Sequence, residues 1–82
     1  MEDEIIGSIS RVLEGELTTN SLPVVPLCLL FDTCKQYGCE LDHDDYRSNG
    51  WQVDFWQDLS YKGNEYTISG SLFDGDYKIY KK

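Results

Sequence analysis

The sequence predicts an α+β fold in which two N-terminal helices pack on one face of a three-stranded antiparallel β-meander, or a four-stranded one if an edge strand is added. Apolar residues recur at helical spacing in the first half of the chain and alternate with polar residues after Trp51. Gly63-Asn64 and Asp74-Gly75 are pairs typical of tight hairpin turns. With 82 residues, the chain is expected to form one small acidic domain over residues 1–82.

Two helices are predicted, over residues 3–16 and 26–37. Pro26 suits the first position of a helix, and Gly38 suits the C-terminal cap of the second helix. Residues 18–21 are expected to stop the first helix, and residues 22–25 to be extended, because residues that precede proline avoid the helical conformation. The apolar stripes that define the helices are Ile5, Ile6, Ile9, Val12, Leu13 and Leu17 in the first and Leu27, Leu30, Phe31, Cys34 and Tyr37 in the second.

The two turns set the register of the predicted meander. Because the residues that flank a two-residue loop pair with each other, Tyr61 is expected opposite Tyr66, and Leu72 opposite Tyr77. Side chains alternate between the faces of a sheet, so this register gathers the apolar residues on one face, against the helices. That face holds Trp51, Phe55, Leu59, Ile68, Leu72 and Ile79.

The opposite face of the predicted sheet is polar apart from three aromatic residues, Trp56, Phe73 and Tyr80. The register makes these three near neighbours and places Asp54 opposite Phe73. Aromatic anchors within a polar rim are typical of protein interfaces, so we predict a partner-binding surface here. Cross-strand stabilisation of the sheet, a cover formed by residues 42–50, and a homodimer contact are the alternatives.

Residues 39–50 give two conflicting signals. Asn49-Gly50 is a further hairpin pair, so residues 44–48 are predicted as an edge strand against residues 52–56. The acidic run from Asp42 to Asp45 disfavours a strand, which leaves a solvated loop as the alternative.

The chain has a formal net charge of −8. Excess negative charge repels nucleic-acid phosphates and anionic lipid, so we expect no direct binding to nucleic acid or membranes. The charge favours a protein partner with a basic surface, and solubility alone is the simpler explanation. The carboxylates expected to steer such a partner towards the aromatic face are Asp42, Asp44, Asp45, Asp54 and Asp58.

The cysteines and the single histidine form a cluster with the spacing C-x5-C-x4-C-x3-H, at Cys28, Cys34, Cys39 and His43. This spacing resembles the Cys3His class of zinc fingers, which bind RNA, and the resemblance implies a zinc-stabilised domain. The predicted helix over residues 26–37 is incompatible with a four-ligand site. Cys28 and Cys34 are six residues apart, so on a helix they would point about 120° away from each other. With the helix in place, the cysteines are core or half-buried thiols and no cofactor is expected.

The sequence contains no catalytic motif: it has no phosphate loop, no glycine-rich dinucleotide turn and no nucleophile elbow. His43 has acidic neighbours, but no second group is predicted to converge on it. We therefore expect no enzymatic activity. The acidic N-terminus is unlike a signal peptide, the prolines interrupt the longest uncharged run, and the odd number of cysteines suits a reducing compartment, so we expect a cytoplasmic protein.

The leading functional hypothesis is a small acidic protein-binding module of inhibitor type. Immunity proteins and phage-encoded anti-defence proteins share this profile of small size, negative charge and absence of motifs. Such a module would occlude a basic surface of a larger protein, including a surface that binds nucleic acid. The alternatives are a structural or assembly subunit that self-associates through the open sheet face, and the zinc-stabilised domain.

Overall fold

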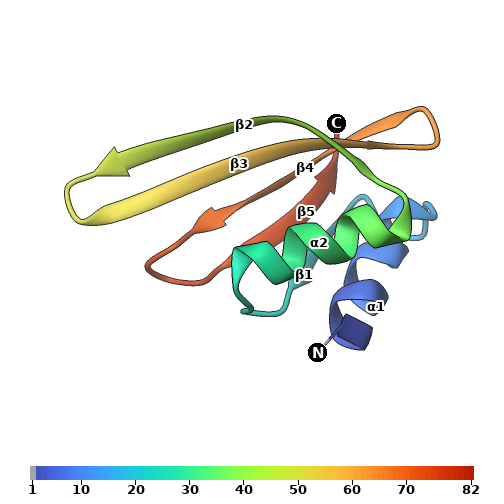
Figure 1. Ribbon diagram of the computed structural model, residues 1–82, viewed down its shortest axis with the longest axis horizontal. Coiled ribbons are helices and arrows are strands. Elements are labelled where there is room, and N and C mark those ends of the chain that lie inside the picture. Colours follow the sequence, from blue (N-terminus) through green and yellow to red (C-terminus); the bar gives the residue numbers. More distant parts are fainter. Residues whose placement is uncertain (1) are drawn as a thin grey trace.

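The computed structural model describes residues 2–82 and has two layers, with both helices on one face of a five-stranded antiparallel sheet (Figure 1). The strands lie in the order β1-β5-β4-β3-β2, so β5 lies between the first strand and the β2–β4 meander. The elements are α1 (Glu2–Leu13), β1 (Thr19–Leu22), α2 (Leu27–Tyr37), β2 (Glu40–Asn49), β3 (Gln52–Tyr61), β4 (Asn64–Ser71) and β5 (Tyr77–Lys81).

The α+β class and the two helices confirm the prediction, but the predicted count of three or four strands is wrong. The unpredicted strand is β1, whose residues lie between the predicted helices, in the stop signal after the first helix and at the start of the extended segment 22–25. β1 is short and mostly polar, and its strand conformation depends on pairing with the distant β5. β2 is the proposed edge strand, and it covers residues 40–49 rather than only 44–48.

The β3–β4 hairpin has a different turn from the predicted one. Its loop is Lys62-Gly63, whose φ angles of 50° and 83° are both positive, as a type I′ turn requires. Tyr61 therefore pairs with Asn64 and not with Tyr66. The physical reason is that type I′ turns favour glycine at the second loop position. Gly63 occupies that position when the loop is Lys62-Gly63.

The β4–β5 connection is also longer than the predicted Asp74-Gly75 turn. It spans residues 72–76 and closes with a hydrogen bond of 2.8 Å from the Gly75 N–H to the Ser71 carbonyl. Ile68 consequently pairs with Ile79, two positions away from the predicted register. A shift of two residues in each hairpin keeps every side chain that remains in β3, β4 or β5 on its predicted face, because the side-chain period of a strand is two.

The core lies between the helices and the inner face of the sheet. Tyr66 crosses it, and its hydroxyl donates a 3.3 Å hydrogen bond to the carbonyl of Leu13, one of the carbonyls left free at the end of α1. Two residues assigned to this core from the sequence lie outside it, since Trp51 is 77% exposed and Leu72 is 43% exposed. The most deeply buried apolar side chains are Ile5, Ile9, Val12, Leu30, Cys34, Phe55, Leu59, Tyr66, Ile68 and Ile79.

The end of α2 carries the glycine cap that the sequence predicts. Gly38 has a φ of 116°, its N–H donates to the Lys35 carbonyl at 3.1 Å, and the Cys39 N–H donates to the Cys34 carbonyl at 3.0 Å. These two bonds form a Schellman motif, which commonly brings an apolar residue beyond the helix against one in its last turn. Here the two apolar positions are the buried Cys34 and Cys39.

A carboxylate joins both helices to the sheet at this end of the molecule. Oε1 of Glu14 accepts hydrogen bonds from the hydroxyls of Tyr37 at 2.9 Å and Tyr61 at 3.2 Å. Burial and the hydrogen bond to Glu14 raise the pKa of Tyr37 to about 12. Glu14 therefore holds together three segments: the residues that follow α1, the last turn of α2 and the end of β3. We call this end of the molecule the proximal end.

Gly70→Ala is expected to lower the free energy of unfolding by about 1–3 kcal/mol, the usual cost of overpacking. A Cβ atom there would lie 2.6 Å from the Asp76 carbonyl oxygen and 2.7 Å from Cδ1 of Tyr77. The matched control is Gly7→Ala inside α1, where no heavy atom beyond the helix's own backbone would lie within 4 Å, and it should raise stability by roughly 0.5–1 kcal/mol. Urea denaturation measures both; unchanged stability in Gly70→Ala would contradict the close approach.

Candidate protein interface

The β2–β3 hairpin extends past the beginning of α2 (Figure 1). Strands β2 and β3 have 10 residues each and α2 has 11. A strand rises about 3.3 Å per residue and a helix only about 1.5 Å, so the helix is roughly half as long as the strands. The inner face of the hairpin therefore has no helix over it near the β2–β3 turn, and we call this the distal end.

Exposed apolar side chains gather at the distal end. Residues 2–82 contain seven large hydrophobic side chains that are exposed, and two of them, Ile6 and Leu17, belong to α1 and the loop after it. The other five lie on the β2–β3 hairpin, on the β4–β5 loop or in the segment that contacts this loop. This distal apolar patch consists of Val24, Tyr46, Trp51, Leu72 and Phe73.

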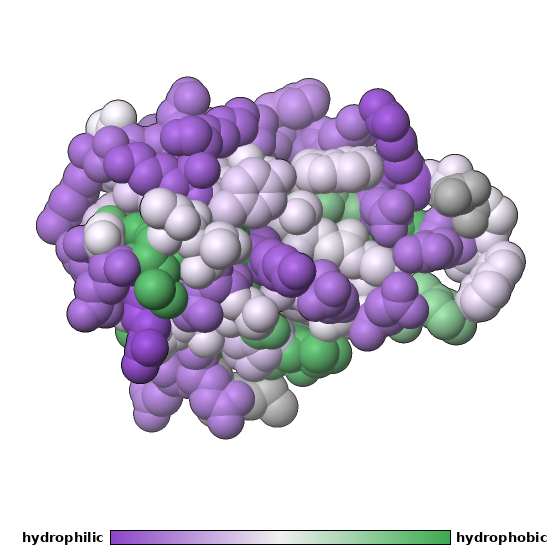
Figure 2. Space-filling model, turned by 180° about the vertical axis from the view of Figure 1, so that it is seen from behind, coloured by the Kyte–Doolittle hydropathy of each residue, from purple (hydrophilic) through white to green (hydrophobic). Residues whose placement is uncertain are grey.

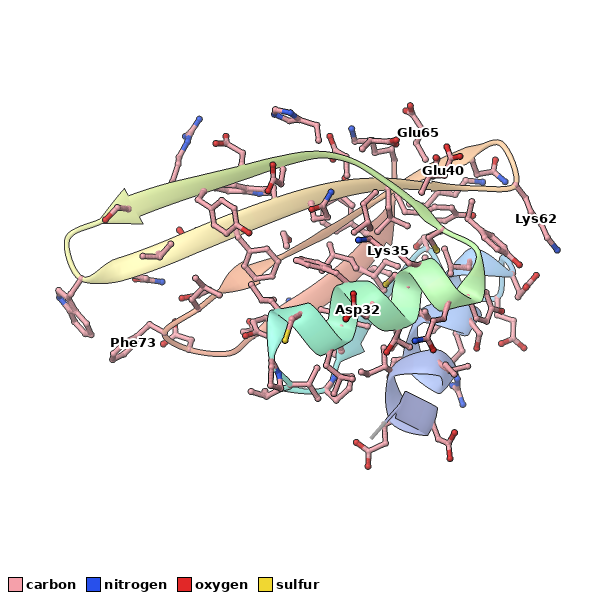
Figure 3. All side chains as sticks on the ribbon, viewed as in Figure 1. Asp32, Lys35, Glu40, Lys62, Glu65 and Phe73 are labelled. Atoms are coloured by element: carbon pink, nitrogen blue, oxygen red, sulfur yellow. The ribbon has the colours of Figure 1, made fainter. Side chains whose placement is uncertain are left out.

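Contacts between loops that are far apart in the sequence build the distal apolar patch. The rings of Trp51 and Phe73 meet edge to face, with centroids 4.4 Å apart and planes at 89°. The β4–β5 loop is tied to β3 by a 2.8 Å hydrogen bond from the Leu72 N–H to the Val53 carbonyl. Figure 3 shows Phe73 on the β4–β5 loop, at the opposite end of the molecule from the β3–β4 turn.

Two further contacts extend the distal apolar patch towards the helices. The ring of Tyr46 lies 6.4 Å from that of Phe55, which in turn meets Phe31 of α2 edge to face at 6.2 Å. Val24 packs against the β4–β5 loop, since a Cβ atom added to Gly75 would lie 3.0 Å from Cγ1 of Val24. The patch is thus continuous with the core and does not consist of isolated side chains.

The same end of the molecule carries much of the negative charge. Residues 44–56 and 72–76 contain five aspartates and one arginine, a net charge of −4, which is half of the formal −8 of the chain. Interfaces that combine an apolar centre with charges at the rim use the first for affinity and the second for steering. The charged residues are Asp44, Asp45, Asp54, Asp74, Asp76 and Arg47.

The predicted cluster of Trp56, Phe73 and Tyr80 on the open face does not form. Phe73 lies in the β4–β5 loop rather than in β4, and it pairs with Trp51. Trp56 lies opposite Ser69 and Tyr80 opposite Thr67, so both are within the paired strands and not in the loop that holds Phe73. The face opposite the helices is largely hydrophilic (Figure 2).

Trp56 has its own surroundings on the open face. The guanidinium of Arg47 lies over its ring, 5.7 Å from the centroid. A shallow hollow of about 200 Å³ opens beside it, between Asp54 and Ser69. Trp56 is half-buried, whereas Trp51 is almost wholly exposed, so Trp51 offers a partner the larger uncovered aromatic surface.

The five predicted steering carboxylates do not share one face. The register puts Asp45 and Asp54 on the open face and Asp44 on the side of the helices. Asp42 lies in the irregularity where the pairing of β2 shifts, between Leu41 and Asp44. Together they surround the hairpin on both sides, which suits steering of a partner towards the edge and end of the sheet.

Asp58, the fifth of these carboxylates, is used within the protein. It accepts a 2.9 Å hydrogen bond from the Thr67 hydroxyl and forms a 3.1 Å ion pair with Lys82. Partial burial acts to raise the pKa of Asp58, but the hydrogen bonds from Thr67 and Lys82 and the charge of Lys82 outweigh it and lower the pKa. Its charge is therefore largely compensated.

The cysteine and histidine cluster does not converge on one point. Cys28 is exposed at the start of α2, Cys34 is buried further along the same continuous helix, and His43 lies on the exposed edge strand. Within residues 2–82, no three His, Cys, Asp or Glu side chains are placed to hold a metal ion. The described residues therefore lack the arrangement of ligands that the zinc hypothesis requires.

Comparisons with protein-family models, with curated proteins and with solved structures found no match to this chain. Among the helices of residues 2–82, none has the length and apolar character needed to cross a membrane. A functional proposal for this protein therefore depends on the geometry and charge of the surface just described.

Asp58→Asn is expected to destabilise the fold at neutral pH and not in strong acid. Because the folded pKa of Asp58 is lowered, its contribution to stability is present above the unfolded pKa and is lost as the pH falls through the folded value. Urea denaturation of both proteins from pH 7 down to pH 2 should show curves that converge in acid. A difference that stayed constant with pH would contradict the ionic role of Asp58.

Cys28 is expected to react with iodoacetamide much faster than Cys34 and Cys39 in the folded protein. Burial, and for Cys34 also the neighbouring Cys39, raises the pKa of Cys34 to about 12; burial raises that of Cys39 to about 11. Because the thiolate is the reactive form, both buried thiols should be inert. Peptide mapping after timed alkylation measures the three rates, with unfolded protein in urea as the control; equal rates in the folded protein would contradict the burial.

Proposed function

We propose that this protein is a small acidic binding module that docks on a basic surface of a larger protein and occludes it, as an inhibitor or immunity protein does. One observation carries the proposal: the distal apolar patch and half of the net negative charge lie at the same end of the fold. Exposed apolar patches on small soluble proteins commonly serve as contact sites.

The anchors of the proposed interface are Trp51 and Phe73. Aromatic side chains bury a large apolar area on binding, and Trp and Tyr are prominent among residues that dominate binding energy. The edge-to-face contact at 4.4 Å holds each ring against the other before any partner arrives. Less side-chain freedom is then lost on binding, which favours affinity.

The aspartates of the distal end supply the preference for a basic partner. Asp74 and Asp76 follow Phe73 in the β4–β5 loop, and both are exposed. Exposed carboxylates contribute little to affinity one by one, but together they speed association with a basic surface and repel an acidic one. The proposed partner includes proteins whose basic surface binds nucleic acid, which this protein would exclude by occupying that surface.

Charge argues against self-association as the main role of the distal end. A symmetric dimer would bring the same patch of each copy together, so the net charge of −4 at this end would face its own duplicate. A basic partner removes this repulsion and replaces it with attraction. The structural or assembly subunit is therefore the second hypothesis, and its test is the oligomeric state.

Trp51→Ala and Phe73→Ala are expected to weaken binding to the partner by at least about tenfold each, because truncating an aromatic anchor typically costs about 2 kcal/mol. Affinity capture with the wild-type protein and mass spectrometry would identify basic candidates. Titration calorimetry with a purified candidate then measures Kd for each variant. The matched control is Leu17→Ala, which truncates an exposed apolar residue outside the distal apolar patch.

Three outcomes would contradict this assignment. If Trp56→Ala weakened binding and Trp51→Ala did not, the open face would be the interface. If Kd stayed constant between low and high salt, the aspartates would have no steering role. If sedimentation showed a dimer that Trp51→Ala dissociates, the distal apolar patch would serve self-assembly.

A further inference from the structure

The two edges of the sheet differ in how they are protected. Edge strand β1 lies against α1, where the Asn20 side-chain amide donates a 3.0 Å hydrogen bond to the Ser8 carbonyl. The side-chain oxygen of Asn20 accepts the Ser21 N–H at 3.1 Å, so part of the free edge of β1 is already satisfied. The other edge strand, β2, pairs only with β3 on its inner side and is exposed over Asp42–Ser48.

The pairing of β3 shows which backbone groups of β2 point away from the sheet. The Val53 carbonyl accepts the Leu72 N–H, so Val53 directs its backbone groups towards the β4 side. Its partner in β2 is Ser48, which must then direct its N–H and carbonyl to the free edge. The alternation of an antiparallel strand gives the same orientation to Tyr46 and Asp44, so three donors and three acceptors face outwards.

The irregularity at Asp42 and His43 limits the free edge to its distal half. The register of β2 shifts between Leu41 and Asp44, as it does at a β-bulge, and bulges interrupt regular pairing with a further strand. Only the stretch from Asp44 to Asn49 is left with a continuous ladder. This stretch runs along the side of the distal apolar patch, to which Tyr46 belongs.

The side chains of this stretch specify the chemistry of an added strand. Asp44 lies on the side of the helices and Asp45 on the open side, so a carboxylate is present on both faces of the edge. Arg47 lies over the Trp56 ring. Tyr46 offers an apolar contact between the charged positions. The edge is therefore complementary to an extended chain that carries Lys or Arg together with apolar residues.

We propose that the basic partner binds by strand addition: an extended segment of it, rich in Lys or Arg, pairs with β2 over Asp44–Ser48 and extends the sheet to six strands. Backbone hydrogen bonds to the outward groups of β2 supply affinity, and the carboxylates and Tyr46 select the segment. This inference rests on the proposed function and specifies how the same end of the protein recognises its partner.

A second copy of the chain is a poorer occupant of this edge. Two β2 strands paired antiparallel over Asp44–Ser48 would be centred on Tyr46, so Asp45 of each copy would face Arg47 of the other. These two contacts are attractive, but the pairing would also bring the net charge of −4 at the distal end of one copy close to that of the other. A basic strand meets no such repulsion, so it is the favoured occupant.

The test uses a short blocked peptide of alternating lysine and valine as the probe, followed by amide chemical shifts of the full 15N-labelled chain. Addition of the peptide is expected to shift the amide signals of Asp44, Tyr46 and Ser48 most strongly, because their N–H groups gain hydrogen-bond acceptors. A lysine-valine peptide that is N-methylated at every residue has the same charge but no backbone N–H to donate to β2. It should bind at least about tenfold more weakly.

Ser48→Pro removes one outward N–H, and proline is tolerated on edge strands where that N–H faces solvent. It should weaken the lysine-valine peptide by at least about tenfold, and the matched control Ser48→Ala, which also lacks the hydroxyl but keeps the N–H, should not. If Ser48→Pro does not fold, the fully N-methylated peptide still tests the ladder, because it removes the donors on the peptide side.

Equal binding of the lysine-valine peptide and its fully N-methylated form, or shifts confined to β1, would overturn strand addition. The proposed function fails separately, when Trp51→Ala and Phe73→Ala leave the affinity of the protein partner unchanged. Dimerisation of the chain alone through β2, seen as loss of the outward amide signals on concentration and prevented by Ser48→Pro, would also overturn the inference, since the edge would then accept an acidic strand.

Discussion

A β-strand advances roughly twice as far per residue as an α-helix, and this difference governs the arrangement of the whole molecule. Helices of 12 and 11 residues cannot cover strands of 10 residues along their full length. The covered part becomes the core, which is held by the hydrogen bond from Tyr66 to the Leu13 carbonyl and by Glu14 between two tyrosines. The uncovered part becomes the distal end, where apolar side chains and carboxylates meet solvent.

The sequence predicts the parts of the fold that depend on local pattern. Helical spacing of apolar residues locates both helices, and alternation in the second half assigns each strand residue to its face, even though both hairpins pair two residues away from the expected register. Strand β1 could not be predicted in this way. Its residues Thr19 to Leu22 show no alternation of apolar residues, and only the partner strand β5 from the far half of the chain makes them a strand.

The candidate site was predictable in kind but not in place. The sequence indicates an aromatic anchor beside excess acid, and Phe73 belongs to both the predicted and the observed group. Alternation along the strand predicts Trp51 in the core, because it is separated from Phe55 and Leu59 by even numbers of residues. The alternation of side chains along a strand tells which face a residue is on, but it does not tell how far the helices reach over that face. The position of Trp51 next to the hairpin turn at Gly50 was the available signal for its exposure.

The strand order also has a consequence for how the chain acquires its structure during synthesis. The helices and the β2–β4 meander can form as they leave the ribosome, but β1 has no sheet partner until residues 77–81 are made and enter between β1 and β4. Until then, the free side of β4 and the part of α1 that packs on β5 have apolar surface without a cover. A nascent chain halted before Tyr77 would therefore be a substrate for chaperones and proteases, and closure of the sheet by β5 is the step that ends this exposure.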